Sequence, residues 1–173
     1  MKCWRITKYN PKFRNELGHY QKKEWTSVSD IGKIFEGKQL TVEEYLNTEN
    51  LYINSIDYFI TALKLSGLKV EELEKNKAEI ALKQPDNLDL YKMTMLFNSV
   101  KNNQFLNIQE VRYISRLILR EQLWCKLTYG STFFVHFGYD YYMYIGCHRE
   151  YKEIFNKIVK SGLFVEQFES PYI

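Results

Sequence analysis

The sequence lacks the motifs from which nucleotide sites, metal sites and common catalytic centres are usually inferred. Its 173 residues include only eight glycines, and these are dispersed, so no loop gathers the backbone amides that hold a phosphate group. The three histidines and three cysteines are scattered as well, without the clustered spacing of a zinc site. No nucleophile elbow or zinc-protease motif is present either. We therefore expect no cofactor and no metal ion.

Long apolar segments and a strong excess of one charge are also absent. No apolar run approaches the ~20 residues that a membrane span requires, and the first residues carry no apolar segment typical of a signal peptide. The chain has 24 basic and 21 acidic residues, a balance that does not favour nucleic-acid binding. Cys3, Cys125 and Cys147 are odd in number and far apart, which favours free thiols over disulfides. Together these features predict a cytoplasmic protein that does not bind membranes.

Aromatic residues are unusually abundant. They make up 16% of the chain, with 14 tyrosines and 11 phenylalanines. Tyrosine offers rigid contact area and is enriched at recognition surfaces, so a protein partner or a homodimer is compatible with this composition. The competing explanation is the codon bias of an AT-rich genome, which favours Lys, Asn, Ile and Tyr. The length and the apolar content of 45% fit a single domain with a core of its own.

Alternation of apolar and polar residues predicts strands towards both ends of the chain. Residues 3–9 alternate, and residues 24–28 suit a short strand that would pair with them as a hairpin. Residues 133–145 alternate over a longer stretch, which is a second hairpin if the chain turns near Gly138 and Asp140, and one long strand if it does not. Residues 163–168 are predicted to form a last strand, whereas residues 68–73 fit a strand or a helix equally.

Helical periodicity is clearest at 41–66 and 108–127. Thr41 with Glu44, and Asn107 with Glu110, have the spacing of capping boxes at which these helices begin. Poor helix formers at 47–50 allow a break in the first helix. Shorter helices are predicted at 30–36, 90–100 and 149–160, and a turn at 85–87. Because helices and strands do not alternate regularly, we expect one α+β domain over residues 1–173, with a largely antiparallel sheet packed against the two long helices and the C-terminal amphipathic helix.

An acidic and aromatic surface is the strongest candidate for a binding site. Residues 166–172 place two carboxylates and two aromatic rings at the end of the chain, and the predicted turn after residue 137 adds others. A surface of this kind suits the basic cleft of a nuclease toxin. The alternative is an edge strand whose charges discourage aggregation. The residues predicted to bind a partner are Asp140, Tyr142, Glu166, Glu169 and Tyr172.

Two other groups of residues suggest different activities. His136 and Asp140 would form an acid–base pair if the hairpin brings them together, as a small enzyme would require; otherwise His136 is a strand residue hydrogen-bonded within the sheet. Arg112, Arg116 and Arg120 recur at every fourth position of a helix and would bind RNA or an anionic ligand. Their alternative is pairing with the chain's own carboxylates, or solvation with buried stems.

Three stretches of the sequence carry a resemblance to other proteins: WRITKYN at 4–10 with WTSVSDIG at 25–32, HFGYDYYMY at 136–144, and GLFVEQFESPY at 162–172. Together they resemble a family of small uncharacterised proteins from Gram-positive bacteria. The resemblance implies no catalytic or binding residue, but small proteins of this kind are often immunity partners of secreted toxins. Our first hypothesis is therefore a non-enzymatic protein-binding module, as an immunity-type inhibitor of a bacterial toxin. A small enzyme and an anion-binding protein are the alternatives.

Overall fold

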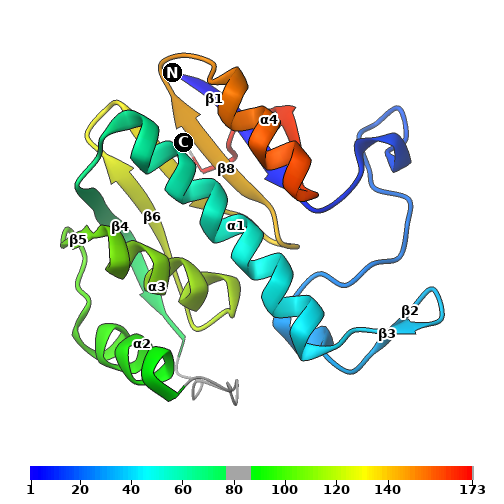
Figure 1. Cartoon of the computed structure of the whole chain (residues 1–173), viewed down its shortest axis with the longest axis horizontal. Coiled ribbons are helices and arrows are strands. Elements are labelled where there is room, and N and C mark those ends of the chain that lie inside the picture. Colours follow the sequence, from blue (N-terminus) through cyan, green and yellow to red (C-terminus); the bar gives the residue numbers. More distant parts are fainter. Residues whose placement is uncertain (77–86, 173) are drawn as a thin grey trace.

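An antiparallel sheet runs through the centre of the computed structural model, which describes residues 1–76 and 87–172 (Figure 1). Within these residues the sheet has seven strands in the order β5-β4-β6-β7-β8-β1-β9, and each neighbouring pair is antiparallel. Helices pack against it, so the predicted α+β class is confirmed. The strands are β1 (Lys2–Thr7), β4 (Gly67–Lys75), β5 (Phe105–Asn107), β6 (Leu123–Tyr129), β7 (Phe133–Phe137), β8 (Met143–Cys147) and β9 (Phe164–Gln167).

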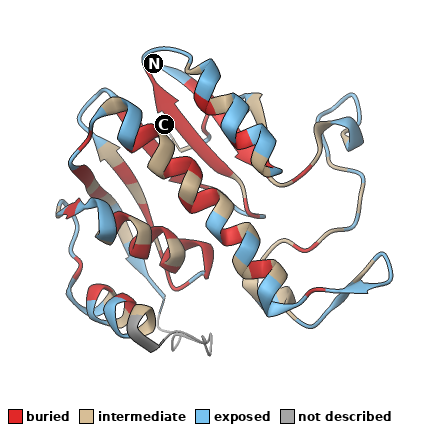
Figure 2. Cartoon of the chain, viewed as in Figure 1, coloured by how far each residue is buried: buried red, intermediate tan, exposed pale blue. Residues whose placement is uncertain are grey.

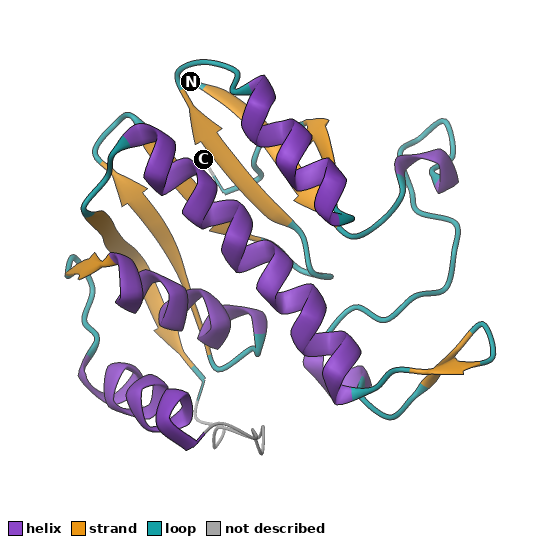
Figure 3. Ribbon diagram, in the orientation of Figure 1, coloured by secondary structure: helices purple, strands orange, loops and turns teal. Residues whose placement is uncertain are grey.

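Helices α1 (Val42–Leu63), α3 (Ile108–Leu119) and α4 (Lys152–Ser161) lie over the same face of the sheet, as Figure 3 shows. α1 crosses the middle of the sheet, α3 contacts β4 and β6, and α4 contacts β9. α2 (Asn87–Ser99) packs against α3. The chain between β1 and α1 contains two 3-10 turns, Pro11–Phe13 and Val28–Asp30, and a short hairpin of β2 (Ile34–Phe35) and β3 (Lys38–Gln39). No helix in the described ranges has the length and apolar character needed to cross a membrane.

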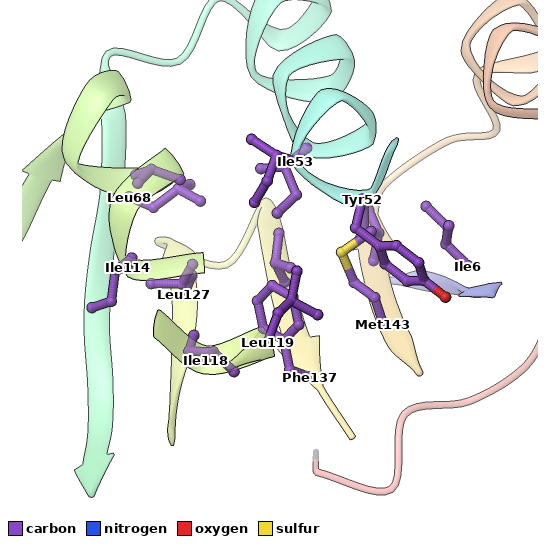
Figure 4. Close-up of a cluster of buried hydrophobic side chains, with 14 of the residues drawn as sticks. Ile6, Tyr52, Ile53, Leu68, Ile114, Ile118, Leu119, Leu127, Phe137 and Met143 are labelled. Carbon is purple, nitrogen blue, oxygen red and sulfur yellow. The ribbon is translucent and has the colours of Figure 1, made fainter. Parts of the chain in front are cut away.

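The main core lies between these helices and the sheet (Figures 2 and 4). Alternate residues of each strand face the helices; in β6 these are Leu123, Cys125 and Leu127, which are buried. Burying one large apolar side chain stabilises a fold by about 1.5–3 kcal/mol, so the alternation determines which face of the sheet the helices occupy.

The opposite face of the sheet is covered in part by the C-terminal tail, residues 168–172. Cys3, Phe134 and Tyr144 form a second buried cluster there, and Tyr172 of the tail packs against it. Gly146 of β8 makes room for the ring of Phe134 on β7, because a Cβ added to this glycine would lie 2.0 Å from a ring carbon. The tail therefore belongs to the folded structure and does not extend away from it.

Most of the predicted elements are confirmed. The helix at 41–66 runs unbroken through 47–50 as α1, and Thr41 caps it by accepting a hydrogen bond from the Glu44 amide at 3.1 Å. The helices at 90–100 and 149–160 are α2 and α4, and the hairpin at 133–145 is β7 and β8. Residues 68–73 belong to strand β4, and the last predicted strand is β9. The turn predicted at 85–87 lies outside the described residues, except for Asn87, at which α2 begins.

The helix predicted at 108–127 is too long, because α3 ends at Leu119 and the strand β6 follows. The end is a Schellman motif, in which the amides of Glu121 and Gln122 donate to the carbonyls of Ile118 and Leu117, both at 2.9 Å. Glu121 has a φ of 59°, a left-handed conformation usually taken by glycine. No glycine marks this helix end in the sequence.

The segment before α1 also differs from the prediction. The strand predicted at 24–28 and the helix predicted at 30–36 are wrong. Instead, Ser27 and Asp30 form a capping box around the 3-10 turn Val28–Asp30, and the strand β2 follows. The capping residues were present in the sequence, but the apolar residues after them are too few to sustain a helix.

Candidate functional site

A pocket of about 650 Å³ opens at one end of the sheet. It lies where β4 and β7 end and β6 begins, next to the C-terminus of α3. Its apolar lining is continuous with the main core, since Leu119 and Phe137, both labelled in Figure 4, belong to the lining and to the core. The volume falls within the range of small-ligand sites in proteins. The remaining lining residues are Thr26, Ser27, Glu74, Asn76, Ile118, Glu121, Leu123, Trp124, Gly138, Tyr139, Asp140, Tyr141 and Tyr172.

Three carboxylates line this pocket: Glu74, Glu121 and Asp140. All three residues are exposed, and none forms a salt bridge with a lysine, arginine or histidine in the described part of the chain. Burial, and then the negative charge of the nearby Asp30, raise the pKa of Glu121 above its ordinary value. The pocket therefore carries negative charge that the described residues around it leave uncompensated, and it attracts cations.

A tight turn between β7 and β8 holds Asp140 at the pocket. Asp140 and Tyr141 have φ values of 58° and 63°, the two positive φ angles of a type I′ hairpin turn. The Tyr141 ring packs edge-on against Trp25 and Tyr52, and the Tyr52 hydroxyl donates to the Tyr141 carbonyl at 2.8 Å. The buried ring therefore fixes the turn, while Asp140 beside it remains exposed.

Aromatic rings form the other walls. Trp124 and Tyr172 pack with ring centroids 5.5 Å apart, and the Trp124 indole N–H donates to the Phe137 carbonyl at 2.8 Å. Tyr139 is 86% exposed beside them. Gly138 leaves room beside these rings, because a Cβ there would lie 3.1 Å from a Tyr144 ring carbon and 3.3 Å from the Tyr172 hydroxyl oxygen.

The five residues predicted to bind a partner lie in three places. Asp140 and Tyr172 line the pocket. Glu166 accepts hydrogen bonds from Arg5 and Arg14 at 3.1 Å, and Arg14 also donates to the Tyr142 hydroxyl at 3.2 Å. These two predicted residues are thus held within the protein by its own arginines. Glu169 is exposed on the C-terminal tail.

His136 is buried at 4% exposure and is not among the residues that line the pocket. Its ring stacks on Phe134 at 4.1 Å, and its Nδ1 is hydrogen-bonded to the Ser170 hydroxyl at 2.9 Å. Burial, helped by the nearby charge of Lys126, lowers its pKa to about 4. The structure thus places Ser170, and not Asp140, at the ring nitrogen, which is the arrangement of a structural strand histidine.

Arg112 and Arg116 of α3, and Arg120 at its C-cap, face carboxylates of α1. Arg120 donates twice to Glu49, from Nε and from Nη2, each at 2.6 Å, and both residues are buried. Arg116 lies 3.4 Å from the same carboxylate, and Arg112 donates to Asp57 at 2.7 Å. The three arginines therefore link α3 and its C-cap to α1. This is the alternative stated for them from the sequence, pairing with the chain's own carboxylates.

The pocket residues that sequence reasoning missed include Glu74, Glu121, Trp124 and Tyr139. The sequence predicted a continuous helix through Glu121 and Trp124. It therefore did not show that Glu121 follows the end of a helix or that Trp124 lies at the start of a strand. A change from helical to alternating periodicity at Leu123 was the available signal. Glu74 follows a register shift in β4, which the sequence does not mark.

The described residues contain no cluster of three or more histidine, cysteine, aspartate or glutamate side chains arranged to hold a metal ion. The thiols of Cys3, Cys125 and Cys147 are free and buried. Comparisons with protein-family models, with curated proteins and with solved structures find no match to this chain.

Proposed function

We propose that this chain is a non-enzymatic protein-binding module whose contact surface is centred on the acidic and aromatic pocket. The proposed partner is a basic protein, and the form that we favour is an immunity-type inhibitor of a bacterial toxin. The proposal is carried by one observation: Glu74, Glu121 and Asp140 surround an aromatic pocket without a cationic partner in the described part of the chain.

Several carboxylates elsewhere in the described residues are instead paired within the chain. The carboxylates of Glu49, Asp57 and Glu166 each have an arginine of the same chain against them. At the pocket the corresponding positive charge is left for a partner to supply. Complementary charge of this kind accelerates association and selects the partner, and its effect decreases as salt rises.

The other two hypotheses lack a comparable observation. A small enzyme would require His136 to reach a substrate, but its ring is buried against Phe134 and the tail. An anion site on α3 would require exposed guanidinium groups, but those of Arg112 and Arg120 are paired with Asp57 and Glu49.

The proposal is tested by affinity capture at low and high salt from extracts of the cells that make the protein. The test variant is E121Q/D140N, and its matched control is E16Q/E150Q, which also removes two negative charges from exposed residues without salt bridges. We expect a basic protein that binds the wild type and the control at low salt and the test variant at least tenfold more weakly. Purified chain should then inhibit the activity of that protein.

Failure to capture any protein would overturn the proposal, and so would either of two results with a captured protein. One is a partner that binds the wild type and E121Q/D140N equally, because the pocket would then lie outside the interface. The other is self-association that E121Q/D140N abolishes, because the partner would then be a second copy of the chain and not a toxin.

A further inference from the structure

We infer that the pocket receives the guanidinium group of an arginine side chain from the partner. The inference rests on the proposed function and names the group that the pocket recognises. It depends on the aromatic walls, on the uncompensated carboxylates and on a similar arrangement found elsewhere in the same molecule.

The aromatic walls favour a flat cation. Trp124 and Tyr172 pack at a tilt of 51°, and the indole N–H of Trp124 is already bonded to a backbone carbonyl, so the orientation of its ring is fixed. A planar guanidinium stacks on such faces and is weakly hydrated, whereas a lysine ammonium is compact and strongly hydrated. Arginine therefore loses less hydration and gains more contact here.

The carboxylates supply the matching charge. Glu121 is partly withdrawn from solvent and lies near the negative charge of Asp30, and both effects raise its pKa. A guanidinium beside Glu121 would relieve that repulsion, and it offers several N–H donors in one plane to the pocket carboxylates. The pocket volume of about 650 Å³ leaves room for the arginine and for the partner's adjoining backbone.

The chain already binds one of its own arginines by the same combination of groups. The guanidinium carbon of Arg5 lies 4.1 Å from the ring centroid of Phe168 and 4.9 Å from that of Tyr142. Its Nε donates to Glu166 at 3.1 Å. That site is filled from within the chain, and the pocket offers carboxylates and rings without an occupant among the described residues.

The experiment is an NMR titration of the full chain with three peptides. The probes are acetyl-Gly-Gly-X-Gly-Gly-amide with arginine, lysine or citrulline at X; citrulline has nearly the shape of arginine without its charge. The reporters are the Trp124 indole N–H and the Gly138 amide, which lie at the pocket. The titration is repeated on E121Q/D140N and on E16Q/E150Q.

We expect the arginine peptide to bind about fivefold more tightly than the lysine peptide, because stacking and bidentate hydrogen bonds favour guanidinium. The citrulline peptide should give no shift at either reporter. E121Q/D140N should weaken arginine binding about tenfold, and E16Q/E150Q should leave it unchanged.

Equal affinity for the arginine and lysine peptides would overturn the inference, and so would arginine binding that survives in E121Q/D140N. Either result leaves the proposed function standing if partner capture still depends on Glu121 and Asp140. Conversely, selective binding of the arginine peptide without any captured protein would leave the inference standing and overturn the proposed function.

Discussion

At the scale of single residues, the most informative positions are those at which the local backbone prefers another amino acid. Glu121 occupies the position of a Schellman motif that glycine usually fills, and its φ is 59°. Its carboxylate meets no cation in the described part of the chain and lies near Asp30. Glycine would be less strained at this position, so substitutions here can separate stability from binding.

Replacing Glu121 by glycine should separate stability from binding. We expect E121G to raise the free energy of unfolding by about 1 kcal/mol, because glycine relieves the left-handed strain. The same variant should weaken binding of the arginine peptide. Urea unfolding and the NMR titration measure the two effects, and E121Q is the control, since it removes the charge but keeps the strain. A loss of stability in E121G would contradict the strain argument.

His136 should make the fold sensitive to acid. Its pKa falls from an ordinary value of 6.5 to about 4 in the folded chain, so between these values the unfolded chain takes up a proton that the folded chain does not. Stability is therefore complete above pH 6.5 and is lost as the pH falls towards 4. We expect a loss of about 2 kcal/mol between about pH 7 and about pH 5.

Urea unfolding at several pH values measures this loss, and H136Q is the control, because its side chain does not titrate. H136Q should show a shallower decrease over the same range. An identical decrease in both proteins would place the acid sensitivity in other groups.

At the scale of elements, hydrophobic periodicity predicted the helices and strands whose apolar residues recur at regular spacing. The helix at 41–66, the hairpin at 133–145 and the amphipathic C-terminal helix follow from repeated apolar positions, and all are present. The end of α3 depends on one residue with a positive φ, and no glycine marks it. Three pocket residues, Glu121, Leu123 and Trp124, lie just beyond that helix end, so the error in the helix concealed part of the site.

The packing of β7 against β8 depends on glycine, which has no side chain, at position 146. In G146A the added Cβ would overlap the buried ring of Phe134, so we expect a loss of about 1–3 kcal/mol in the free energy of unfolding. In an F134A background the same change should cost much less, since the ring is gone. Urea unfolding of the two single variants and the double variant measures the coupling. Equal costs in both backgrounds would show that Phe134 does not cause the effect.

At the scale of the whole molecule, the sheet presents two unlike faces. Helices α1, α3 and α4 cover one face, and the C-terminal tail covers part of the other (Figure 1). The tail is held by the contact of Ser170 with His136 and by the packing of Tyr172 on Trp124. Because Tyr172 also lines the pocket, the site is completed only when the chain has folded through its last strand.

The position of Tyr172 has a practical consequence for anyone who labels or immobilises this protein. Lys2 pairs with Cys147, whereas Ile6 pairs with Met143, so the start of β1 lies at the sheet end away from the β7–β8 turn. A fusion at the N-terminus should leave arginine-peptide affinity unchanged, whereas a bulky fusion at the C-terminus should reduce it by crowding the mouth of the pocket. Titrating both fusions with the same peptide measures the difference, and equal affinities would mean that the tail leads any attached domain away from the opening.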